Sequence, residues 1–119
     1  MAKYLFFSVG SGLNLREEGI MVSSDQIMAI TPKSTDTTAM LIETHDGGID
    51  QITFTHDNTA TTTDGTARGH RCKDISRAIA ECCNAGPHAT LIDVVDLDNN
   101  IFYGNLSFIT SMSISKNAI

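Results

Sequence analysis

Residues 94–109 of this chain have the sequence VVDLDNNIFYGNLSFI. The apolar start at 94–97 predicts a strand, and the Asp-Asn-Asn at 98–100 predicts a tight turn, because these residues tolerate left-handed backbone. A second apolar run follows, in which Gly104 stands two residues before Leu106. A glycine inside a strand marks a bulge or a sharp bend. The stretch therefore predicts a hairpin with a bent second strand, which is typical of a small, strongly curved barrel.

The region before this hairpin contains one helical pattern, which predicts a helix at about residues 72–84. The apolar residues of this pattern recur at helical spacing and form a single stripe. They are Ile75, Ala78, Ile79 and Cys82. Residues 57–70, which precede the pattern, are rich in Asp, Asn, Thr and Gly and predict the longest loop.

Short apolar runs separated by turn residues predict strands in the rest of the chain. The predicted strands cover residues 3–9, 20–22, 27–30, 39–42, 49–55, 89–97, 100–107 and 108–115. Residues 49–55 alternate apolar and polar side chains, so they indicate a strand with one buried face that pairs with 39–42 as an antiparallel hairpin. Many short strands with one helix predict a mostly β (α+β) fold, with antiparallel pairing in a sandwich or barrel. We expect residues 1–119 to form a single domain.

The composition limits the classes of partner. Eight basic and fourteen acidic residues give a net charge of −6, which argues against a surface that binds nucleic acid everywhere. No apolar run approaches the roughly 20 residues that span a bilayer, so we expect no membrane contact and a cytoplasmic location. The three cysteines, Cys72, Cys82 and Cys83, have no repeating spacing and predict reduced thiols rather than a disulfide framework.

Motifs for catalysis or metal binding are weak. No serine lies in a Gly-x-Ser-x-Gly elbow, and on a helix Cys72 and Cys82 would lie about 15 Å apart, too far to share one zinc ion. His45 and His56 each stand beside an aspartate at a strand end, where turn or surface roles are expected. We therefore predict no catalytic residue, no metal and no cofactor. An enzyme would require a pocket that joins His56 or His88 to a carboxylate.

The densest group of positive residues lies where the predicted loop meets the predicted helix. It consists of Arg68, Arg71 and Lys73, with Arg77 one helical turn later. One interpretation is a phosphate-contact patch assisted by free backbone N–H groups at the helix start. The other is a solvated helix start whose charges balance Asp74 and Glu81.

The hairpin at 97–109 resembles the first motif of the Sm/LSm family of RNA-binding proteins. In that comparison Asp98-Asn99 lies at the turn, Phe102 at the apolar position, Gly104 at the bent-strand glycine and Leu106 at the following core position. The helix ahead of the hairpin also matches the order in that family. The remaining strands would come from residues 1–56, which is a different chain order.

The resemblance implies a small, strongly bent antiparallel β-barrel of the Sm-like or SH3-like kind. It also implies a non-enzymatic, homo-oligomeric ring that binds nucleic acid, with single-stranded RNA or DNA as the expected partner. The expected phosphate contacts are Arg68, Arg71 and Lys73, with Tyr103 for base stacking and Asn105 for base hydrogen bonding. The alternative is a structural or assembly ring with no nucleic-acid role, which the acidic balance and the loss of the family's Asp and Asn favour.

Overall fold

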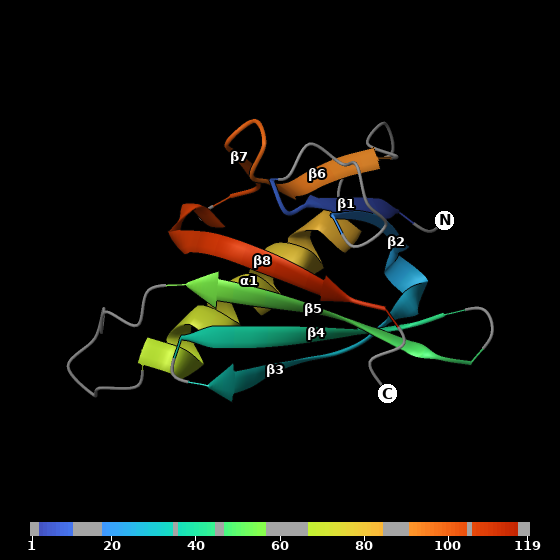
Figure 1. Cartoon of the computed structure of the whole chain (residues 1–119), viewed down its shortest axis with the longest axis horizontal. Coiled ribbons are helices and arrows are strands. Elements are labelled where there is room, and N and C mark those ends of the chain that lie inside the picture. The colour runs from blue at the N-terminus through green and yellow to red at the C-terminus, as the bar shows by residue number, and fades with distance from the viewer. Residues whose placement is uncertain are drawn as a thin grey trace.

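The protein is mostly β, with one α-helix and two four-stranded sheets (Figure 1). The computed structural model describes residues 3–10, 18–34, 36–44, 47–56, 67–84, 91–104 and 106–116. In Figure 1 the second sheet faces the viewer, the helix α1 lies behind it, and the first sheet lies along its upper side.

The first sheet, called sheet A, has the strand order β2-β1-β6-β7. Its strands are β1 (Tyr4–Ser8), β2 (Gly19–Ser23), β6 (Leu91–Asp96) and β7 (Ile101–Phe102). The strands β1 and β2 pair antiparallel, whereas β1 and β6 pair parallel, with Tyr4 opposite Leu91. The expectation of antiparallel pairing throughout is therefore wrong for the pair β1 and β6.

The second sheet, called sheet B, is antiparallel and has the order β3-β4-β5-β8. Its strands are β3 (Ile27–Ser34), β4 (Thr37–Glu43), β5 (Ile49–His56) and β8 (Ile109–Ser115). The predicted hairpin is confirmed as β4 and β5, and β5 alternates half-buried and buried residues along its whole length. The strand β3 extends beyond the predicted 27–30 and past Pro32, because an edge strand tolerates a residue without an N–H.

The helix α1 covers Ala67–Cys83 and so begins five residues before the predicted start at 72. Its predicted apolar stripe is confirmed, since every member is buried: Ile75, Ala78, Ile79 and Cys82. The helix packs beside β3 and β4, where the Cys72 thiol lies 4.0 Å from the Ile30 carbonyl oxygen. Residues 67–70, expected in a loop, are thus helical, and residues 57–66 lie outside the described part.

The C-terminal hairpin forms, but its second strand is much shorter than predicted. Val95 pairs with Phe102 and Asp96 with Ile101, and Asn100 takes a left-handed φ of 56° in the turn. The strand β7 then ends, so the predicted strand over 100–107 is wrong. Gly104 has a φ of 59° and lies in a turn before a short 3-10 helix, η2 (Leu106–Phe108). The glycine therefore lies in the turn that follows β7 rather than inside a bent strand.

The two sheets and α1 share one core. The Phe7 ring of sheet A packs against the Phe54 ring of sheet B with the centroids 5.8 Å apart. Leu106, predicted as a core position, is 1% exposed. The described strands pair as two separate sheets and do not close into one barrel.

Candidate functional site

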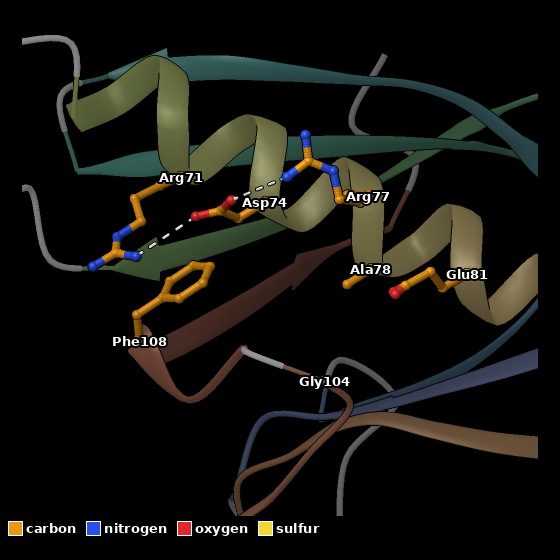
Figure 2. A pocket seen from close by; sticks show the side chains of 7 residues that line it. All are labelled: Arg71, Asp74, Arg77, Ala78, Glu81, Gly104 and Phe108. Carbon is orange, nitrogen blue, oxygen red and sulfur yellow. Dashed lines mark ion pairs between the residues drawn. The ribbon is translucent and has the colours of Figure 1, made fainter. Parts of the chain in front are cut away.

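A pocket of about 350 Å³ lies between α1 and the segment that links β7 to β8 (Figure 2). Its lining comes from one side of α1 and from Gly104 and Phe108 on the facing segment. The residues are Arg71, Asp74, Arg77, Ala78, Glu81, Gly104 and Phe108. The helical spacing of the α1 members places them on one face, so the pocket follows from the same periodicity as the buried stripe beside it.

Arg71 is held on two sides inside this pocket. Its guanidinium carbon lies 4.3 Å from the centroid of the Phe108 ring, and its Nη1 lies 3.7 Å from Asp74 Oδ2. The Arg71 side chain is only 15% exposed, so both contacts are partly desolvated. A cation over an aromatic face is attracted by the ring quadrupole. Arg71 therefore joins α1 to η2, as Figure 2 shows.

Asp74 is shared between two arginines. Its Oδ1 lies 3.9 Å from Nη1 of Arg77, whose side chain is 66% exposed and reaches solvent. Glu81 follows Arg77 at the i+4 position and adds a second carboxylate to the lining. Two cations and two anions thus balance within the pocket. Asp74 pairs with two of the cluster's arginines, whereas the interpretation as a solvated helix start expected exposed charges and Arg71 is only 15% exposed.

A buried polar pair lies behind Phe108. His56, at the end of β5, is 2% exposed, and its Nε2 lies 3.0 Å from the hydroxyl oxygen of Thr38. The His56 ring meets the Phe108 ring edge-on, with the centroids 6.2 Å apart. The expected surface role of His56 is therefore wrong. The alternation of β5 could have indicated this burial, because His56 shares its face with Phe54.

The expected nucleic-acid contacts are only partly brought together. Arg71 lies in the pocket, and Lys73 lies exposed on α1. Tyr103 is partly buried against the core near the other end of α1, where burial and then the charges of Cys82 and Glu81 raise its pKa. Arg68 belongs to α1 but its side chain lies outside the described part, and so does Asn105. Lys73 and Glu81 are eight residues apart, about 12 Å along the helix, so Lys73 and Tyr103 do not form one compact site.

The three thiols are free and lie along α1. Burial raises the pKa of the Cys82 thiol to about 12, and the charges of Cys83 and Glu81 add to this shift. Burial also raises the pKa of Cys72 and of Cys83. A raised pKa disfavours the reactive thiolate. Within the described residues, no group of three or more His, Cys, Asp or Glu side chains could hold a metal ion.

The outer face of sheet A carries an apolar patch that the sequence interpretation missed. Tyr4 and Phe6 share this face, since Leu5 and Phe7 between and after them are buried on the other. Leu91 lies opposite Tyr4, and Met21 lies opposite Phe6. Tyr4 is 44% exposed, Met21 55% and Leu91 56%. We call Tyr4, Phe6, Met21 and Leu91 the sheet A patch. Only the pairing of three strands from distant parts of the chain creates it.

Comparison with known proteins finds no matching family model, no matching curated protein and no matching solved structure. In the part of the chain that is described, no helix is long and apolar enough to cross a membrane. The function must therefore be inferred from the chain's own surfaces.

Proposed function

We propose that this protein is a non-enzymatic assembly protein that associates with copies of itself through the sheet A patch. The observation that carries this proposal is that Tyr4 lies beside Leu91 and Met21 beside Phe6 on three neighbouring strands, with the exposed Asp93 opposite Phe6 at the border of the patch. Contiguous exposed apolar side chains on a sheet mark an interaction surface, whereas single exposed ones do not. A hollow adjoins the patch and makes this surface concave, a shape into which a partner can fit; it is lined by Tyr4, Met21, Ser23, Asp25 and Gln26.

The α1 pocket supports an assembly role better than a chemical one. Its cations are engaged by Asp74 and Phe108, and the His56 imidazole behind it is buried against Thr38. A catalytic base needs hydrogen-bond reach to a substrate proton. The same contacts hold α1, η2 and β5 together, which is a structural role within the chain.

Light scattering coupled to size-exclusion chromatography tests the proposal. Met21→Asp places a charge on the β2 side of the sheet A patch and should convert the oligomer to a smaller species. Met28→Asp is the matched control, since Met28 is 49% exposed but lies on β3 of sheet B. A wild-type chain that is monomeric, or equal effects of the two substitutions, would contradict the proposal. Circular dichroism on both variants separates loss of assembly from loss of fold.

A second proposal is the Sm-like ring that binds single-stranded RNA or DNA. The observation in its favour is that Lys73 and Arg77 are exposed one turn apart on α1, and that Arg77 lines the same pocket as Arg71. Under this proposal the two sheets correspond to a strongly bent, open barrel of the Sm-like kind. Arg68, Arg71 and Lys73 would contact phosphates, and Tyr103 and Asn105 would contact bases.

Binding of a labelled single-stranded oligonucleotide at low and high salt tests this second proposal. Affinity should fall steeply with salt, and Lys73→Ala with Arg77→Ala should weaken binding across all sequences. Lys33→Ala is the control, because Lys33 is an exposed lysine on β3. Binding that is absent, insensitive to salt, or weakened equally by the control would exclude it.

A further inference from the structure

Two adjoining hollows form a groove across η1, the 3-10 turn Ser24–Gln26 that connects β2 to β3 (Figure 1). The first hollow, of about 540 Å³, adjoins the sheet A patch. The second hollow, of about 350 Å³, lies on the sheet B side of the turn. Asp25 and Gln26 line both hollows, so the two meet at η1. The second hollow is also lined by Ile27, Met28, Glu43 and Thr44. We call the two hollows together the η1 groove.

Hydrogen bonds hold η1 in place from both sheets. The Gln26 side chain accepts a bond from the Ser23 N–H at 2.9 Å and donates one to the Glu43 carbonyl oxygen at 3.2 Å. On the side of sheet A, the Ser24 N–H donates to the Lys3 carbonyl oxygen at 2.8 Å, and the Lys3 N–H donates to Ser24 Oγ at 3.1 Å. The groove is therefore already formed in the free chain, so binding there requires little further ordering of the backbone.

Exposed apolar side chains gather in this groove. Five large apolar side chains are exposed in the described part of the chain, and three of them line the groove: Tyr4, Met21 and Met28. Methionine is flexible and polarizable, so it packs against apolar side chains of varied shape and is common on binding surfaces. The groove thus offers adaptable apolar contacts on both sides of η1.

The charged residues of the groove are all acidic. Asp25 and Glu43 are exposed, and neither carboxylate forms an ion pair with another described residue. Of the described residues, no lysine, arginine or histidine lines either hollow. The net charge of −6 on the whole chain adds to this local negative potential. Charge complementarity therefore favours a cationic occupant over an anionic or neutral one.

We propose that the η1 groove binds a basic amphipathic segment of another protein. The apolar side chains of this segment pack against Tyr4, Met21 and Met28, and its lysine or arginine side chains pair with Asp25 and Glu43. A groove lined by methionine is a recurring site for an amphipathic segment, and the carboxylates select a basic one.

This inference goes beyond the proposed self-association and does not rest on it. The groove shares Tyr4 and Met21 with the sheet A patch, so one molecule cannot use these two side chains for both partners at once. Asp25, Met28 and Glu43 lie outside the patch. Substitutions at these three positions therefore test the groove and leave the patch intact.

Fluorescence anisotropy with a labelled synthetic peptide tests the role of charge. The peptide has about 14 residues, with leucines at helical spacing and lysines at the other positions. It should bind the wild-type chain more tightly than two control peptides, one with glutamate in place of each lysine and one with serine in place of each leucine. Glu43→Gln should weaken binding about threefold at low salt. Glu81→Gln is the matched control, because it removes one exposed carboxylate from α1, outside the groove.

A second pair of variants tests the apolar contact. Met28→Gln should weaken binding of the same peptide about fivefold, because apolar area buried in the complex is lost. Ile101→Gln is the matched control, since Ile101 is 44% exposed but lies on β7, outside the groove. Circular dichroism on all four variants separates loss of binding from loss of fold.

Three results would overturn the inference: no binding of the lysine–leucine peptide, equally tight binding of either control peptide, or equal losses from a groove variant and its matched control. A smaller oligomer on Glu43→Gln or Met28→Gln would also overturn it, because a second copy would then occupy the groove. A monomeric wild-type chain that binds the peptide through Glu43 and Met28 would support it and reject only the proposed self-association.

Discussion

At the residue scale, the pair Thr38 and His56 places a hydroxyl and an imidazole inside an otherwise apolar region. Thr38 is 0% exposed, and its hydroxyl lies 3.0 Å from His56 Nε2. Thr38→Val keeps the shape but removes the partner of a buried polar atom. We expect a loss of about 1–3 kcal/mol in the free energy of unfolding, measured by urea titration. Thr55→Val, on the outer face of β5, should change it by less than about 0.5 kcal/mol. Equal losses would contradict the special role of the pair.

Two glycines with left-handed backbone test how much a close contact adds to conformational strain. Gly10 has a φ of +92°, and an added Cβ would lie 3.0 Å from the Leu97 Cβ. Gly47 has a φ of +83° with no atom within 4 Å of such a Cβ. Both Gly→Ala substitutions should cost about 1–2 kcal/mol for the backbone. Gly10→Ala should cost about 1 kcal/mol more, because the contact must relax. Thermal unfolding of the two variants gives the difference, and its absence would exclude the close contact.

The thiol of Cys82 predicts a loss of stability in alkali. Its pKa of about 12 in the fold lies above the ordinary value of 9.0. As the pH rises past 9.0, the unfolded chain loses the proton of the Cys82 thiol before the folded chain does. The stabilising effect of the protonated thiol is therefore complete below pH 9.0 and is lost as the pH rises through about 12. Urea unfolding between about pH 8 and about pH 11 should show declining stability, with a shallower decline for Cys82→Ala. Identical slopes would show that Cys82 is not the source.

At the scale of elements, patterns that repeat along the chain predicted structure well. The alternation of β5 and the apolar stripe of α1 were confirmed residue by residue, because burial on one face leaves a periodic signal. The second strand of the C-terminal hairpin was not predicted correctly. Gly104 was consistent with either a bend or a stop, and only the end of β7 at Phe102, with Gly104 in the following turn, distinguishes them. The early start of α1 also had no apolar signal, since residues 67–71 contain mostly polar residues.

The attachment of α1 to η2 predicts unequal roles for its two pocket arginines. Arg71 is 15% exposed and lies over Phe108, whereas Arg77 is 66% exposed. Arg71→Ala should reduce the free energy of unfolding by about 1 kcal/mol, because a partly desolvated cation–π contact is lost. Arg77→Ala should change it by less than about 0.5 kcal/mol, as expected for an exposed ion pair. Chemical denaturation of the two variants measures this difference, and a larger effect for Arg77 would contradict it.

At the scale of the whole molecule, the surfaces were beyond what the sequence could predict. The sheet A patch joins β1, β2 and β6, and no local pattern indicates that these strands become neighbours. Local patterns predicted the core, but long-range pairing determines which apolar residues remain exposed.

The net charge of −6 predicts how salt distinguishes the two proposed functions. Self-association brings like charges together, so screening them from about 0.05 M to about 0.5 M salt should increase the oligomer fraction. The affinity for nucleic acid should instead fall as salt rises, because the release of counterions from the phosphates becomes less favourable at high salt. Sedimentation velocity across this range measures the first effect. An oligomer that dissociates with rising salt would contradict assembly through apolar surfaces.

Pro32 has a consequence for how far association through sheet B can proceed. A sheet that accepts further strands at both edges can add copies without limit and so form a linear polymer. Here the β3 edge carries Pro32, which has no N–H to offer to a further strand. Strand addition at this edge is therefore disfavoured. A single proline thus keeps this side of sheet B from serving as a template for a fibre.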